Sequence, residues 1–191
     1  MFGDTLPWAR GFDPQSSWAA GDQAGLEGKE YIVWDETYSA FVRLRIVRNS
    51  AGIALEGKRL VTFKAGKLGT EVDGYARRPA AHCYPIDHTY TTTMPANSLM
   101  YIVVEGPTLI LTGLAGDATN VFSADDFVMC LTGATSQATT AGRIGAGTFA
   151  ITGNTAPTLV AEIFGQLGRA LTARTTANTN SGTLVMMKGR W

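Results

Sequence analysis

The chain has 191 residues, enough for one sizeable core or for one core and an extended arm. Its 16 Lys and Arg residues balance 16 Asp and Glu residues, and this zero net charge argues against a nucleic-acid-binding protein, which would carry a basic excess. Only 17% of the residues are charged, and this low fraction favours a protein that covers much of its surface by assembly.

The beginning of the chain lacks the apolar core of a signal peptide, and no run of residues is as apolar and as long as a membrane span. Two cysteines, Cys83 and Cys130, lie far apart and match no disulfide framework. We expect them to be free, buried thiols. The sequence therefore predicts a soluble protein that is made in a reducing cytoplasm and has no membrane partner.

Residues 1–28 differ from the rest of the chain because they show no period of 2 or 3.6. They contain two prolines, several glycines and four large aromatic residues: Phe2, Trp8, Phe12 and Trp18. A disordered tail is normally poor in aromatic residues, so these rings are expected to lie against another surface. We predict an extended N-terminal arm over 1–28 that docks on another chain, with its own domain as the alternative surface.

Residues 29–191 are predicted to form a β-rich domain, because short segments of Val, Ile, Thr and Phe alternate with Gly-rich turns. The predicted strands are 31–35, 40–48, 59–63, 72–76, the two halves of 99–113, 127–131, one around 148–152, and 183–187. Residues 77–97 are predicted to be a polar connection. In 40–48, apolar residues alternate with Arg43 and Arg45, so one face of this strand is expected to be buried.

The segment Leu99–Gly113 is the most apolar part of the chain. Glu105, Gly106 and Pro107 divide it, and we predict a strand on each side of a turn. Both faces of the first strand are apolar, so it should be covered on both sides and lie at the centre of the core.

Residues 158–173 have two alternative interpretations. Leu159, Ile163, Leu167 and Leu171 recur every four residues, as on one face of a helix. Gly165 and Gly168 disfavour a helix. We favour a strand that breaks at the glycines and keep a single helical turn as the alternative.

The most plausible cluster of metal ligands or catalytic groups is His82, Cys83, Asp87 and His88. Zinc sites need about four ligands at regular spacing, which this Pro-containing segment does not offer. A Cys83–His88 nucleophile and base would lack a third, orienting residue. We expect no metal site, no cofactor and no catalytic residue here.

Two other patterns are weaker still as sites. The segment Gly142–Gly147 does not match a phosphate-binding glycine motif, and we predict a turn between strands. Asp125 and Asp126 are adjacent, so they would not share a proton, and we predict a solvated turn.

Arg43, Arg45 and Arg48, followed by Lys58 and Arg59, form the one local basic patch of the sequence. We interpret it as a solvated sheet face. Because Arg is favoured at interfaces, the alternative is a surface that binds an acidic partner.

Several segments together resemble the small decoration (cement) proteins of tailed-bacteriophage capsids. The segments that carry the resemblance are Phe41–Gly52, Val72–Ala76, Met94–Pro107, Leu167–Leu171 and Thr183–Met187. The likeness lies in turn chemistry and β pattern over about residues 29–187.

This resemblance implies a compact β-barrel or β-tulip-like domain that forms homotrimers on the exterior of the virion capsid. There it would bridge neighbouring copies of the major capsid protein, without enzymatic activity. The arm aromatics named above, together with Arg43, Arg45 and Arg48, are the expected partner-binding residues. Two alternatives remain: a tail, baseplate, glycan-binding or receptor-binding β-module, and, more distantly, a small enzyme that uses Cys83 and His88.

Overall fold

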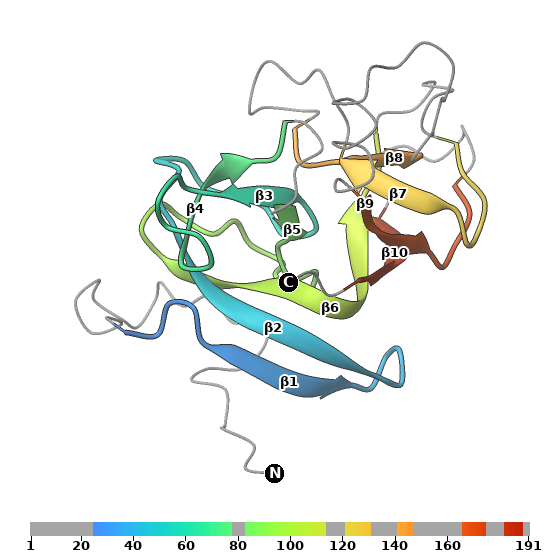
Figure 1. Ribbon diagram of the computed structural model, residues 1–191, viewed down its shortest axis with the longest axis horizontal. Helices are drawn as coiled ribbons and strands as arrows, with labels where there is room; N and C mark the ends of the chain where they lie inside the picture. The colour runs from blue at the N-terminus through green and yellow to red at the C-terminus, as the bar shows by residue number, and fades with distance from the viewer. Residues whose placement is uncertain are drawn as a thin grey trace.

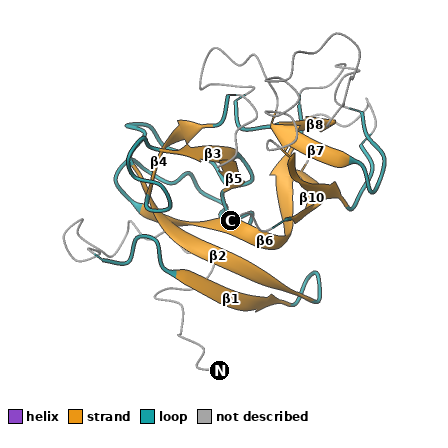
Figure 2. Cartoon of the chain, in the orientation of Figure 1, coloured by secondary structure: helices purple, strands orange, loops and turns teal. Residues whose placement is uncertain are grey.

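The computed structural model of the chain describes residues 25–77, 83–113, 121–130, 141–146, 166–174 and 182–188. This part is all-β, as predicted, with ten strands and no helix (Figures 1 and 2). The strands are β1 (Glu30–Asp35), β2 (Ala40–Asn49), β3 (Leu60–Phe63), β4 (Glu71–Tyr75), β5 (Cys83–Pro85), β6 (Leu99–Leu111), β7 (Phe127–Cys130), β8 (Ile144–Ala146), β9 (Gln166–Ala170) and β10 (Gly182–Met187). Within these ranges no helix is long and apolar enough to cross a membrane.

The first half of the domain is a curled sheet with the strand order β5-β3-β4-β2-β6. β1 forms an antiparallel hairpin with the first part of β2. On the same edge of β2, β4 pairs in parallel with the end of that strand. Ile86, directly after β5, bridges to Ile102 of β6. This bridge brings the two ends of the sheet together, so the sheet has the form of a half-barrel (Figure 1).

The second half is built from the end of β6 followed by β10, β9, β7 and β8. All the pairs along this path are antiparallel. Thr112, just after β6, forms a parallel bridge with Ile144 of β8. This sheet therefore also curls back towards its first strand, and β6 belongs to both halves.

β6 is one strand of 13 residues, and the predicted turn at its centre is wrong. Arg43 lies opposite Glu105 while Leu44 lies opposite Val103, so one extra residue of β6 forms a bulge. Gly106 has φ +102, a conformation that glycine adopts readily, and an added Cβ would lie 2.6 Å from the Phe41 carbonyl oxygen.

The glycine and proline mark the point where β6 changes partners. Residues before Gly106 pair with β2, and residues from Gly106 onward pair with β10, where Pro107 lies opposite Met186. Figure 1 shows β6 running beside β2 and then turning to run beside β10. The Gly-Pro pair therefore bends a continuous strand.

The first half of β6 is covered on both faces, as predicted. Tyr101, Ile102, Val103 and Val104 are at most 1% exposed. Burying each such side chain stabilises the fold by about 1.5–3 kcal/mol. This strand is therefore the centre of the core.

The strands predicted at 31–35, 40–48, 59–63, 72–76, 127–131 and 183–187 are confirmed to within a residue or so. The predicted polar connection over 77–97 is wrong in part, because it contains β5, whose backbone pairs with β3. β8 was not predicted. The strand favoured within 158–173 is confirmed over Gln166–Ala170, but it continues through Gly168 instead of breaking there. The predicted strand around 148–152 lies outside the described residues.

Candidate functional site

Three arginines of β2 lie on its outward face and each contacts a carboxylate of the same chain. The pairs are Arg43 with Glu105, Arg45 with Glu30, and Arg48 with Glu27. Their side chains are only partly exposed, because the carboxylates and neighbouring backbone cover them. Three positive charges thus face three negative charges, and this part of the predicted basic patch carries no surplus charge.

The last four residues of the predicted arm, 25–28, lie against β2. The Gly28 N–H donates to the Ile46 carbonyl at 2.8 Å, and the Arg48 Nε donates to Glu27 Oε1 at 2.9 Å. Arg48 also donates to the Asn97 carbonyl at 2.7 Å. The chain is therefore fixed to the domain from about Gly25 onward.

Glu27 is held in its charged form by this arrangement. Burial alone would raise its pKa. Hydrogen bonds from its own backbone N–H and from Arg48, the charge of Arg48 and the Gly25 N–H together outweigh burial, so the pKa lies below its usual value of 4.5.

The change Glu27→Gln should reduce the free energy of unfolding by about 1 kcal/mol at pH 7. Because the pKa of Glu27 is lowered in the folded state, its contribution is present above the unfolded value of 4.5 and is lost as pH falls through the folded value. Urea unfolding of both proteins at pH 7 and at stepwise lower pH should show the difference shrinking as the pH falls below the unfolded value of 4.5.

The matched control is Glu36→Gln, because Glu36 is exposed in the turn between β1 and β2. This change should leave the unfolding free energy almost unchanged at pH 7. An equal loss for both variants, or a Glu27→Gln loss that does not depend on pH, would contradict the role given to the Glu27–Arg48 pair.

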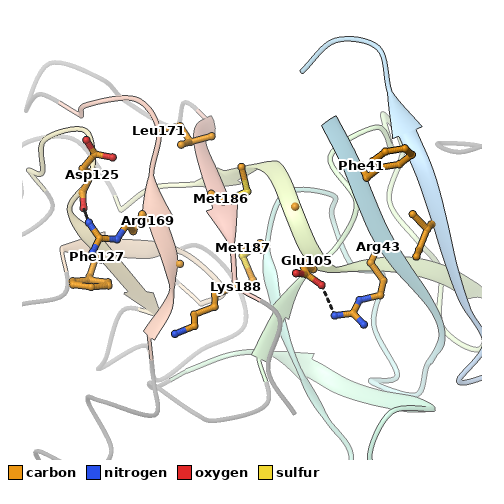
Figure 3. A pocket seen from close by; sticks show the side chains of 13 residues that line it. Phe41, Arg43, Glu105, Asp125, Phe127, Arg169, Leu171, Met186, Met187 and Lys188 are labelled. Carbon is orange, nitrogen blue, oxygen red and sulfur yellow. Dashed lines mark hydrogen bonds and ion pairs between the residues drawn. The ribbon is translucent and has the colours of Figure 1, made fainter. Parts of the chain in front are cut away.

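A groove of about 1010 Å³ lies between the β1–β2 hairpin and the strands β9 and β10, across the bend of β6 (Figure 3). Its apolar lining comes from both halves of the domain. The large apolar residues that line it and are exposed are Ile32, Phe41, Phe127, Leu171 and Met186. Among them, Ile32 and Phe41 are about two-thirds exposed, at 66% and 67%. We call this surface the inter-sheet groove.

The first wall of the inter-sheet groove is the outward face of the hairpin. Val42 and Leu44 point into the core, so strand alternation turns Phe41 outward. The Phe41 ring contacts the ring of Trp34 edge-on, with centroids 5.0 Å apart, and Trp34 is also half exposed. Together with Ile32, these rings form a continuous apolar surface.

The second wall is formed by β7, β9 and β10. The guanidinium of Arg169 lies over the Phe127 ring, 4.5 Å from its centroid, and donates to the Asp125 carbonyl at 3.3 Å. Lys188 lies beside this wall, and Arg43 and Glu105 face each other on the opposite side (Figure 3). The groove is therefore an apolar surface with a charged rim, a composition typical of protein contact sites.

Of the cluster considered for metal binding or catalysis, the structure describes Cys83 in β5, and Asp87 and His88 just after it. Cys83 and Cys130 form no disulfide and are buried, as predicted. His88 Nδ1 lies 3.3 Å from Thr108 Oγ1 and 3.5 Å from Asp87. No group of three His, Cys, Asp or Glu residues among the described residues could hold a metal ion. His82 lies outside those residues.

The predicted turn at Asp125 and Asp126 is confirmed, whereas the turn predicted over Gly142–Gly147 is wrong in part, because Ile144–Ala146 form strand β8. Asp125 and Asp126 are exposed in a turn before β7, and Asp126 accepts the Ser123 N–H at 2.7 Å. Gly142 lies in the turn before β8 with φ +75. Gly147 lies outside the described residues.

Arg59 is buried, so its assignment to a solvated patch is wrong. Its guanidinium packs on the Tyr75 ring at 3.6 Å, and Nε donates to the Ala141 carbonyl at 2.9 Å. Arg143 donates to the Thr112 carbonyl at 2.8 Å and Arg174 to the Gly113 carbonyl at 2.6 Å. Three buried arginines thus bind backbone carbonyls: Arg143 and Arg174 bind just after the end of β6, and Arg59 binds the turn before β8.

These arginines lie close enough to affect one another. Burial lowers the pKa of Arg143, and the charges of Arg59 and Arg174 lower it further, while Glu56 opposes this effect. Sequence reasoning did not single out Arg143 and Arg174, because each is an isolated charge in a Gly- and Thr-rich segment. We assign the three arginines a structural role.

The predicted arm residues Phe2, Trp8, Phe12 and Trp18 lie outside the described residues. The inter-sheet groove was missed, although one signal was available. Phe41 is in phase with Arg43 and Arg45, so the alternation already placed a large apolar ring on the outward face. No protein-family model matches this chain, and a comparison with curated proteins also finds no match.

Proposed function

We propose that the chain is a structural virion protein that binds the outer surface of a phage capsid and stabilises the shell by bridging neighbouring major capsid subunits. The observation that supports this proposal best is the inter-sheet groove with its exposed apolar walls. Large exposed apolar surfaces with a polar rim mark protein contact sites. The groove thus indicates a protein that works within an assembly, and the resemblance of the sequence to capsid decoration proteins gives the kind of assembly, which is a phage shell.

Stabilisation of the shell would follow from mass action. A protein that binds only the assembled lattice shifts the equilibrium towards that lattice. A homotrimer would engage several capsid subunits at once, so weak individual contacts would add through avidity. In this proposal the protein contributes interface area and performs no catalysis.

A second candidate is a tail, baseplate, glycan-binding or receptor-binding β-module. The half-exposed ring of Trp34 against Phe41 favours it, since sugar rings can pack on exposed aromatic faces. The two proposals differ in where the protein lies in the particle, which is the shell in one and the tail in the other.

The first test is the mass of the purified full chain by light scattering, followed by co-sedimentation with empty shells of the phage that encodes it. We expect a trimer that sediments with the shells and saturates at a fixed ratio to the major capsid protein. A monomer that stays in the supernatant would contradict the decoration proposal and favour the second candidate.

A further inference from the structure

The inter-sheet groove leaves apolar side chains from both halves of the domain open to solvent. Ile32 and Phe41 on one wall and Leu171 and Met186 on the other are exposed. We propose that residues 1–24 of a neighbouring copy of this chain fill the inter-sheet groove. This inference rests on the proposed function, because it assigns to the groove the contact that joins copies within the assembly.

The composition of residues 1–24 fits the groove. This segment holds four large aromatic side chains, Phe2, Trp8, Phe12 and Trp18. Each aromatic side chain can bury about 150–250 Å² of surface. A groove of about 1010 Å³ is as large as pockets that enclose a drug-sized ligand, so it has room for more than one ring.

The direction of the chain favours a neighbour over the same copy. Gly28 and Glu27 are fixed beside Ile46 and Arg48, whereas the groove lies at the Phe41 end of β2. β1 runs from this anchor towards the groove, because it is antiparallel to β2. Residues 25–28 therefore lie at the end of β2 that is away from the groove.

The length of the segment makes a neighbouring copy accessible. Twenty-four extended residues span at most about 80 Å. In the same copy, the groove lies about 17 Å from the anchor along β2, which is five residues at 3.4 Å each. To reach it, residues 1–24 would have to turn back along their own β1–β2 hairpin. A neighbouring copy whose groove lies beyond the Arg48 end of β2 requires no such reversal.

The charge of residues 1–24 also fits the inter-sheet groove. Residues 1–24 contain three aspartates and one arginine: Asp4, Asp13, Asp22 and Arg10. The second wall of the groove carries Arg169 and Lys188 against Asp125, while Arg43 and Glu105 neutralise each other at the first wall. A net negative segment would thus meet a net positive wall.

Photo-crosslinking of the full chain in solution, without shells, tests this inference. A photo-reactive benzoylphenylalanine replaces Phe41 or Phe127, which keeps an aromatic ring at the position. The chain with the photo-reactive residue also carries Ala20→Ser, which changes the mass of its own residues 1–24. It is co-expressed with a full chain that has neither change. Mass spectrometry then identifies the crosslinked peptides.

We expect crosslinks from both positions to peptides within residues 1–24, including peptides of the unlabelled mass, which can only come from another copy. The control places the photo-reactive residue at Leu68, which is 61% exposed in the loop between β3 and β4 and does not line the groove. It should give no such crosslinks.

Two results would overturn the inference. Crosslinks only to the labelled mass would place each segment in its own copy. Crosslinks only to other segments, or no crosslinks at all, would show that residues 1–24 do not fill the groove. Because no shells are present, these results are independent of co-sedimentation, which tests the proposed function separately.

Discussion

Replacing Gly168 by alanine should prevent folding or lower the free energy of unfolding by about 3 kcal/mol or more. Gly168 lies in β9 opposite Met187 of β10. A Cβ added there would lie 2.0 Å from the Met186 carbonyl oxygen and 2.9 Å from its carbonyl carbon. These atoms are backbone, so relief of the clash requires β9 and β10 to separate. The yield of soluble protein and the urea midpoint measure the effect.

The matched control is Gly182→Ala, in the adjacent strand pair. There an added Cβ would lie 3.3 Å from the Leu109 Cβ, and all three near atoms belong to that side chain. A side chain can shift by a few tenths of an ångström, so we expect a loss of at most about 1 kcal/mol. Equal midpoints for Gly168→Ala and the unchanged protein would show that the strands are not packed as described.

Deleting residues 1–24 should abolish trimer formation and reduce attachment to shells by at least 100-fold, while the β domain stays folded. The contacts of Glu27 and Gly28 with β2 remain in this variant, because the deletion stops before Gly25. Loss of multivalency alone can account for a change of about 10²–10⁴ in affinity. Light scattering, circular dichroism and co-sedimentation of the truncated chain measure the three expectations.

Two full-length variants show whether the aromatic rings are responsible. Serine at all four positions, Phe2, Trp8, Phe12 and Trp18, should reproduce the deletion. The double change Ser16→Ala and Ser17→Ala, in the same segment, should bind shells like the unchanged chain. A truncated chain that decorates shells as well as the full chain would contradict the role of the arm.

The hairpin and its buried face could be predicted because alternation is a local signal. Val42, Leu44 and Ile46 are buried and the arginines between them point outward, as the spacing of residues 40–48 predicts. In β6 before its bend, the same alternation places apolar residues on both faces, so the burial of both faces could also be predicted. Such predictions need only the geometry of a single strand.

The continuity of β6 could not be predicted from its own residues. Gly-Pro normally ends a strand or marks a turn. Here the chain continues because Phe41 and Val42 approach Gly106 from one side and Met186 pairs with Pro107 on the other. These partners are more than 60 residues away in one direction and about 80 in the other, beyond the reach of any local pattern.

The inter-sheet groove depended on the same kind of information. Ile32 and Phe41 come from the first hairpin, whereas Phe127, Leu171 and Met186 come from three later segments. None of these residues indicates a binding site by itself, since single exposed apolar residues are common on protein surfaces. Only the register of β6 with both of its partner strands brings the two walls together.

Because β6 belongs to both halves of the domain, it also determines how the domain unfolds. The backbone ladder to β2 and the ladder to β10 are carried by the same 13 residues. Neither half can release β6 without taking an inner strand from the other half. The domain should therefore unfold in one cooperative step, with the amides of β6 exchanging with solvent last, so a mechanical load on one half is shared by the whole.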